Sequence, residues 1–270
     1  MDLHYRHIGK GPPLIVLHGL YGSSDNWITV GRILSEKFEV FLPDQRNHGN
    51  SPHSKEHNYM LLKNDLLGFM DRQNINKAII IGHSMGGKVA MFFAADYPER
   101  IQSLIVVDIS PGSYKSLQEP MNQITLHMNI ISTMMAVNFS EVKSRTDVDS
   151  QLATGIPSRR IRQFLLKNVT RDNKGKYSWK LNIGALYNNL PEIMDGLNIQ
   201  RITKGDKLKD FPVLFIKGEK SDYITESDYP AIYTLFPEAE IVSIPGAGHW
   251  LHAEQPELFI KTVTGFLKEQ

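Results

Sequence analysis

The chain has 270 residues, a length that suits a single α/β sheet enzyme. Charged residues make up 22% and the formal net charge is +1, which excludes a surface field that would gather nucleic acid or anionic lipid nonspecifically. The absence of cysteine excludes disulfides, thiolate metal sites and a cysteine nucleophile. There is no apolar run of about 18 residues and no apolar stretch typical of a signal peptide, so we expect a cytoplasmic protein without a membrane span.

Short apolar runs alternate with segments of helical spacing along most of the chain. Four of the runs are unbroken apolar tetrads, which is typical of strands buried on both faces of a parallel sheet. The alternation predicts a doubly wound, mostly parallel α/β sheet. The expected strands are 14–17, 40–42, 78–81, 104–107, 213–216 and 241–244, and the clearest helices are 59–73, 88–97 and 257–267.

The alternation stops between residues 111 and 209, where helical spacing and polar connections replace buried strands. We therefore predict an α/β core of residues 1–111 and 210–270, with residues 112–209 inserted as a helical cap. The methionines of this segment have two interpretations: they line an adaptable acyl pocket, or they are ordinary core residues where the cap meets the sheet. They are Met121, Met128, Met134 and Met135.

The strongest local motif is Gly82-His83-Ser84-Met85-Gly86, which has the G-x-S-x-G pattern of a nucleophile elbow. A strand pattern precedes the motif and a helical pattern follows it, as an elbow requires. The serine of an elbow sits on a strained strand-to-helix turn, and only small neighbours let the flanking backbones pass. Ser84 is therefore the predicted nucleophile, with a simple glycine-rich turn as the alternative.

A serine hydroxyl needs a base to become a good nucleophile, and the chain has 10 histidines. His249 follows the last predicted strand and precedes a helix, which places it at the carboxyl edge of the sheet, where catalytic groups of such sheets lie. It also fits the Ser…Asp…His chain order of these enzymes. His252 would lie on the same side three residues later, but the spacing supplies no third ligand, so we expect no metal and no cofactor.

Two aspartates are candidates for the acid that orients the histidine. Asp108 ends the strand that follows the nucleophile helix, and Asp222 follows the next strand, the more usual place for this acid. The usual Gly-x-x-Asp spacing, counted from Gly218, reaches Ser221 and leaves Asp222 one residue late. The residues alone leave both candidates open.

Two backbone N–H groups are expected to form the oxyanion hole. Met85 supplies one as the residue after the nucleophile, and Leu20, in the loop after strand 14–17, is the best candidate for the second. Each such donor stabilises the transition state by about 3 kcal/mol.

The substrate pocket is harder to locate. Arg46 and Asn47 belong to a polar loop after strand 40–42, and they either contact substrate or brace the loops beneath the nucleophile. The predicted pocket residues are His18, Arg46, Asn47, Met128 and Trp250.

Five stretches carry a resemblance to known proteins: HGLYGSSDNW (18–27), DQRNHGNSP (44–52), IGHSMGGKVAM (81–91), VVDISP (106–111) and GAGHWLHAEQPE (246–257). With them the sequence resembles the α/β-hydrolase superfamily and, more narrowly, YbfF-type bacterial esterases and their mitochondrial relatives. The resemblance covers most of the predicted core and the cap only loosely. It implies an eight-stranded sheet with a helical cap after the sixth strand, and hydrolysis of carboxylic esters or of acyl thioesters such as acyl-CoA.

The resemblance also bears on the acid. Members of this family often lack an acid after the strand that follows the cap and have a GGNS-like sequence there, which residues 218–221 (GEKS) resemble. Asp108 is then the implied acid, and Asp222 is a departure from the family pattern.

Other functions share these features. C–C bond hydrolases, lyases and cofactor-free haloperoxidases use the same triad and cap, whereas dehalogenases and epoxide hydrolases would need aspartate in place of Ser84. A catalytically idle ligand-binding homologue is the alternative from a different class. We expect a small-molecule acyl ester or thioester as the partner and no nucleic acid.

Overall fold

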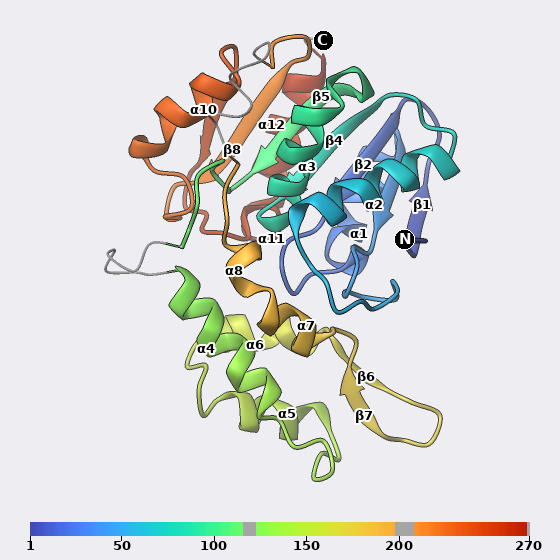
Figure 1. Cartoon of the computed structure of the whole chain (residues 1–270), viewed down its shortest axis with the longest axis vertical. Helices are drawn as coiled ribbons and strands as arrows, with labels where there is room; N and C mark the ends of the chain where they lie inside the picture. The colour runs from blue at the N-terminus through green and yellow to red at the C-terminus, as the bar shows by residue number, and fades with distance from the viewer. Residues whose placement is uncertain (116–122, 198–207, 269–270) are drawn as a thin grey trace.

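The computed structural model describes residues 1–115, 123–197 and 208–268, and seven strands in these ranges form one sheet (Figure 1). The strand order is β1-β3-β2-β4-β5-β8-β9, with β1 antiparallel to β3 and all other pairs parallel. The strands are β1 (Tyr5–Ile8), β2 (Pro13–Leu17), β3 (Glu39–Pro43), β4 (Ala78–His83), β5 (Ile101–Val107), β8 (Val213–Gly218) and β9 (Glu240–Ile244).

The predicted doubly wound, mostly parallel sheet is confirmed, and each of the six expected apolar runs lies in a strand. The expected eight-stranded sheet is wrong for the described residues, in which the main sheet has seven strands. Only β1 precedes β2, so the long insertion follows the fifth strand of the chain and not the sixth. Strand β1 has no apolar run because it pairs at the edge of the sheet and its side chains are exposed or half-buried.

Successive side chains of the central strands pack into two separate cores. In β4, Ile79 and Ile81 belong to the core under α1 and α12, whereas Ile80 belongs to the core under α2 and α3. This period of two explains the unbroken apolar runs, because both faces of the sheet are covered. The covering helices are α1 (Ile28–Leu34), α2 (Tyr59–Arg72), α3 (Met85–Asp96), α10 (Tyr229–Leu235), α11 (Leu251–Glu254) and α12 (Pro256–Lys268), with 3₁₀ turns η1 (Ser24–Trp27), η2 (Pro98–Arg100) and η3 (Glu226–Asp228).

Between β5 and β8 the chain leaves the sheet and forms a separate group of elements, which lies below the sheet in Figure 1. The sequence predicted helices here, but the group also contains a two-stranded hairpin. Each strand of the hairpin has only three residues, too few to show an alternating pattern. The elements are α4 (Gln123–Met135), α5 (Arg145–Leu152), α6 (Arg159–Leu166), β6 (Val169–Arg171), β7 (Tyr177–Trp179), α7 (Ile183–Asn188) and α8 (Leu190–Ile193).

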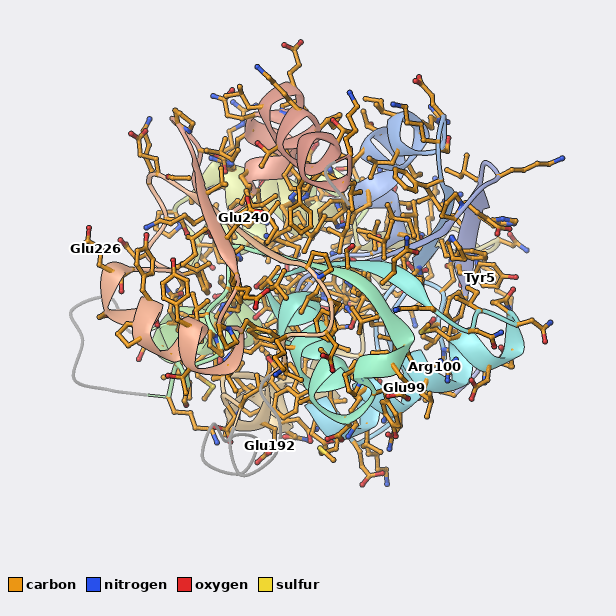
Figure 2. The ribbon with its side chains drawn as sticks, turned by 90° about the horizontal axis from the view of Figure 1, so that it is seen from above. Tyr5, Glu99, Arg100, Glu192, Glu226 and Glu240 are labelled. Atoms are coloured by element: carbon orange, nitrogen blue, oxygen red, sulfur yellow. The ribbon has the colours of Figure 1, made fainter. Side chains whose placement is uncertain are left out.

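Some charged side chains lie on the outside of the molecule, whereas others, such as Lys88 and Asp108, are buried. Figure 2 shows Glu226 at the edge of the molecule, and both Glu226 and Glu99 are exposed. No helix in the described ranges is long and apolar enough to cross a bilayer.

Helix α3 begins in very close contact with the strands beneath it. A Cβ atom at Gly86 would lie 2.3 Å from the carbonyl oxygen of Leu17 in β2, and one at Gly82 would lie 2.4 Å from the carbonyl oxygen of Gly86. Both distances are far below van der Waals contact, and the opposing atoms are backbone atoms that no side-chain rotation can move. The glycines of the predicted elbow therefore set how closely helix and sheet approach.

We expect Gly86→Ala to destabilise the fold by about 2 kcal/mol or more, because the new methyl group can be accommodated only by moving α3 away from β2. Gly265→Ala is the matched control, since a Cβ atom there would meet nothing within 4 Å. Because Gly265 lies within α12, this control should be neutral or stabilising by about 1 kcal/mol. Urea unfolding of both variants measures the difference, and equal effects would contradict the close-packing argument.

Candidate active site

Ser84 occupies the turn between β4 and α3 with φ 53° and ψ −120°. Few non-glycine residues adopt such a left-handed backbone, which indicates strain held in place by the surroundings. The Ser84 N–H donates to the carbonyl oxygen of Val107, and its carbonyl oxygen accepts the Lys88 N–H. These bonds fix the turn between the neighbouring strand and the first turn of the helix. The side chain is held at the carboxyl end of β4, as the elbow motif predicts.

Asp108 follows β5 directly and is fully buried. Its Oδ1 accepts the backbone N–H of Gly218 at 2.9 Å, and its Oδ2 lies 2.7 Å from His249 Nδ1. The hydroxyl of Ser221 also donates to Oδ2. These donors compensate the burial of the carboxylate, which would otherwise be very costly.

The structure thus brings Asp108, and not Asp222, to His249. Asp222 is exposed, and within the described residues its carboxylate has no hydrogen bond or ion pair. Ser221, which stands at the position where the usual spacing expects the acid, donates to the carboxylate of Asp108.

His249 is held on three sides. Its Nδ1–H faces the carboxylate of Asp108, and its carbonyl oxygen accepts a hydrogen bond from His83 Nε2 at 2.9 Å. The ring of Tyr223 stacks on the imidazole with centroids 3.9 Å apart and planes inclined by 22°. Because Nδ1 carries the proton donated to Asp108, Nε2 keeps its lone pair and can accept one.

The backbone N–H groups of Leu20 and Met85 have no acceptor within the described residues, and both residues lie with Ser84 around one cavity. The Gly19–Leu20 peptide is fixed from behind, since the Gly19 carbonyl oxygen accepts bonds from Gly22 N–H and His18 Nδ1, both at 2.9 Å. Two unpaired donors beside a serine are the arrangement that an oxyanion hole requires.

His18 and His48 brace this loop as neutral rings. His18 Nε2 accepts the Gln45 N–H at 2.9 Å, and His48 Nε2 accepts the Tyr21 N–H at 3.3 Å. Burial lowers the pKa of both histidines below the ordinary value, which keeps an acceptor nitrogen on each ring.

The cavity beside Ser84 is narrow, with a volume of about 20 Å³, and is lined mainly by apolar and aromatic side chains. Of the residues predicted from the sequence, it contains the nucleophile and both oxyanion donors but none of the five predicted pocket residues. The lining residues are Leu20, Tyr59, Ser84, Met85, Lys88, Ile109, Tyr114, His127, Ile193, Met194 and Tyr223.

The predicted pocket residues lie elsewhere, for separate reasons. Arg46 forms a buried ion pair with Asp65, Nε to Oδ2 at 2.6 Å, which is the bracing interpretation of that loop. Asn47 accepts hydrogen bonds from Ser54 and Asn182. His18 lies behind the oxyanion loop, as described above.

The two remaining pocket candidates face other surroundings. The ring of Trp250 packs on Phe164, and its face meets the guanidinium of Arg160. Met128 on α4 is 38% exposed, and its neighbour His127 lines the cavity instead. Of the other methionines in this segment, Met134 is buried in the core, Met135 is 52% exposed, and Met121 lies outside the described residues.

Lys88 is a cavity residue that the sequence did not point to. It lies one helical turn after Ser84, and its Nζ donates to the carbonyl oxygens of Pro111, Gly112 and Asp195. Burial lowers the pKa of Lys88 to about 7, although the nearby carboxylates of Asp195 and Asp228 oppose the shift. The one sequence signal that could have found Lys88 is its spacing of four residues from Ser84, which places both residues on the same face of the predicted helix.

No group of three or more His, Asp or Glu side chains in the described parts of the chain is arranged to hold a metal ion. The histidines around His249 are occupied in packing: His252 stacks on Trp27 with centroids 4.1 Å apart, and its ring meets that of His83 edge to face.

We expect His252 to make the protein acid-sensitive. Burial lowers its pKa to about 3, whereas a histidine in the unfolded chain has a pKa near 6.5. Below about pH 6.5 the unfolded state therefore binds a proton that the folded state rejects, and stability falls by up to about 1.4 kcal/mol per pH unit. Between pH 7.5 and pH 5 the wild type should lose about 2 kcal/mol more than His252→Phe, which keeps a ring on Trp27 but cannot titrate.

Urea unfolding at the two pH values measures this difference. The comparison at pH 7.5 is the control for packing, because the histidine is neutral there in both states. Parallel losses in the wild type and the variant would show that His252 does not contribute to acid sensitivity.

Comparisons with known proteins agree with this geometry. The α/β hydrolase fold family matches residues 12–256. A solved marine microorganism esterase is 45% identical, with a TM-score of 0.92, and the match covers 98% of this chain and 99% of that one. The sn-1-specific diacylglycerol lipase ABHD11 of Danio rerio is 36% identical, over 96% of this chain and 80% of its own length. Esterase YbfF of Escherichia coli is 32% identical, over 95% of this chain and 93% of its own length. The chain therefore belongs to the α/β hydrolase fold family and is a carboxylic ester hydrolase.

Proposed function

We propose that the protein hydrolyses carboxylic esters or acyl thioesters through an acyl-enzyme on Ser84, with His249 as general base and Asp108 as the acid that orients it. The observation that carries this proposal is the 2.7 Å contact between His249 Nδ1 and the buried Oδ2 of Asp108, at the same sheet edge as the strained turn of Ser84. If the pair of Asp108 and His249 had only a structural role, there would be no reason for it to lie beside a nucleophile elbow.

The first half of the reaction forms the acyl-enzyme. His249 Nε2 accepts the Ser84 proton as Oγ attacks the carbonyl carbon, and the imidazolium then gives that proton to the departing alcohol or thiol. Asp108 stays ionised and stabilises the imidazolium. In the second half, a water takes the place of the alcohol or thiol, and His249 accepts a proton from it as its oxygen attacks the acyl carbon. The imidazolium then returns this proton to Ser84 Oγ as the acyl–oxygen bond breaks and the carboxylic acid is released.

In the transition state, negative charge develops on the carbonyl oxygen of the substrate. The backbone N–H groups of Leu20 and Met85, which have no acceptor within the described residues, are placed to stabilise this charge. Because the carbonyl of the Gly19–Leu20 peptide already accepts two hydrogen bonds, this donor is oriented before substrate arrives. Preorganised donors of this kind need no rearrangement during the reaction, which is the source of their effect.

The names of the relatives support an ester as the substrate, since they are called esterases and a diacylglycerol lipase. The largely apolar lining of the cavity suits an acyl chain. A thioester such as acyl-CoA and a cytoplasmic location remain parts of the proposal.

Ser84→Ala and His249→Ala should each lower kcat for a p-nitrophenyl ester by about 10⁴-fold or more, and the double variant should be no slower than the single ones. The effects do not add because the two side chains act as a unit. A fluorophosphonate probe gives an independent readout, and it should label the wild type but not Ser84→Ala. If kcat of the double variant falls by the product of the two single reductions, the pairing of Ser84 with His249 is contradicted. A wild type that resists labelling would favour the alternative of a catalytically idle, ligand-binding homologue.

Asp108→Asn should lower kcat by about 10⁴-fold, because the amide cannot hold the required tautomer of His249 or stabilise its charged form. Asp222→Asn makes the same chemical change at an exposed carboxylate in the loop after β8 and should alter kcat less than about twofold. Steady-state rates of the two variants decide between the acids, and the reverse ranking would refute the assignment of Asp108.

A further inference from the structure

Three polar side chains from distant parts of the chain meet beside the active site. Tyr21 follows the oxyanion residue Leu20, His127 comes from α4, and Tyr223 lies in the loop after β8. The Tyr21 hydroxyl lies 3.2 Å from His127 Nδ1, and the Tyr223 hydroxyl lies 3.1 Å from His127 Nε2. His127 and Tyr223 line the cavity with Ser84, and the Tyr223 ring stacks on His249.

The hydrogen atoms of this chain of three groups can be counted. Burial, and secondarily the imidazole of His249, lowers the pKa of His127 to about 4, so the ring is neutral with one donor and one acceptor nitrogen. Two hydroxyl hydrogens and one imidazole hydrogen then serve the two contacts to His127. One hydroxyl hydrogen is left over in either tautomer. Within the described residues, neither hydroxyl has a second hydrogen-bond partner that could use it.

Burial decides which tyrosine keeps the free hydrogen. Tyr21 is only 4% exposed and does not line the cavity, so an unused hydrogen there would be a buried, unsatisfied donor. Tyr223 borders the cavity, where its hydrogen can meet a ligand. The favoured arrangement therefore has the Tyr21 hydroxyl donating to Nδ1 and the Nε2–H of His127 donating to the Tyr223 oxygen. The hydroxyl hydrogen of Tyr223 then remains available to the cavity.

The position of Tyr223 indicates which part of the substrate it meets. In the proposed mechanism His249 delivers the proton to the leaving oxygen, and the ring of Tyr223 lies in contact with His249. The groups next to His249 in the cavity therefore face the leaving group. The apolar residues of the cavity, such as Ile193 and Met194, offer no donor of this kind.

We propose that the Tyr223 hydroxyl donates a hydrogen bond to an oxygen atom on the leaving group, and that the preferred substrates are esters of polyhydric alcohols. An alcohol with a second oxygen on the carbon next to its ester-bearing carbon, as in a glycol monoester, has the required acceptor. His127, whose Nε2 lies 3.1 Å from the Tyr223 hydroxyl, is the positioning residue that holds Tyr223 in this role. The proposal rests on the proposed ester hydrolysis at Ser84.

Two esters that differ only at the relevant position test the proposal. Propyl butanoate has a methyl group where 2-hydroxyethyl butanoate has a hydroxyl group. We expect the wild type to show a kcat/KM for the hydroxyethyl ester at least about tenfold above that for the propyl ester, the effect of one well-placed hydrogen bond in a buried site.

Tyr223→Phe and Tyr21→Phe form a matched pair, because each removes one phenolic oxygen from the same hydrogen-bonded chain. Tyr223→Phe keeps the ring against His249 but has no hydroxyl, so the kcat/KM ratio should fall to near one. Tyr21→Phe removes the only acceptor that the described residues offer to an Nδ1–H, and so favours the Nε2–H tautomer, which leaves the Tyr223 hydrogen free. Its ratio should stay at the wild-type value or rise.

Retention of the ratio in Tyr223→Phe, or an equal loss in both variants, would overturn the proposal. A preference that follows a hydroxyl placed on the acyl chain instead would overturn the assignment to the leaving group. Labelling of Ser84 by a fluorophosphonate probe shows that each variant has folded. If the wild type hydrolyses both esters equally, only this inference fails, whereas absence of both hydrolysis and labelling would refute the proposed function itself.

Discussion

Helix α3 begins so close to β2 that the backbone of Gly86 lies against the carbonyl oxygen of Leu17, and the active site is built around this contact. Because the chain must turn from β4 into the helix within one residue, Ser84 takes a left-handed backbone. The same turn leaves the N–H of Met85 at the start of the helix without an acceptor in the described structure. The position of the nucleophile and one oxyanion donor therefore follow from a single packing constraint.

Parallel strands place the other groups beside this turn. Asp108 directly follows β5, Ser221 follows β8 and His249 follows β9, so all three belong to the carboxyl edge at which β4 ends in Ser84. Asp108 is buried at this edge with its carboxylate satisfied by Gly218, Ser221 and His249. Histidines that support the loops are kept neutral by burial, which lets them act as acceptors.

Features that depend on local sequence could be predicted well. The apolar runs predicted the central strands because both sheet faces are covered, whereas the half-exposed edge strand β1 and the three-residue hairpin strands carry no such pattern. The pocket could not be predicted in the same way. Met128 and His127 are adjacent in sequence, yet neighbours on a helix point about 100° apart, and only His127 faces the cavity. Arg46 is polar and follows a strand, but the buried partner that occupies it, Asp65, lies on α2.

The sequence by itself determined the sheet, the elbow around Ser84 and the two loops that hold the candidate acids, because these depend on side-chain periodicity and on residues within a few positions of one another. Only the tertiary structure decided which carboxylate meets His249, since Asp108 is 141 residues away from it and Asp222 is nearer in the chain but exposed. It alone also brought Tyr21, His127 and Tyr223 together. Contacts between distant segments follow from how helices and loops pack on the sheet, and that packing leaves no periodic pattern in the sequence.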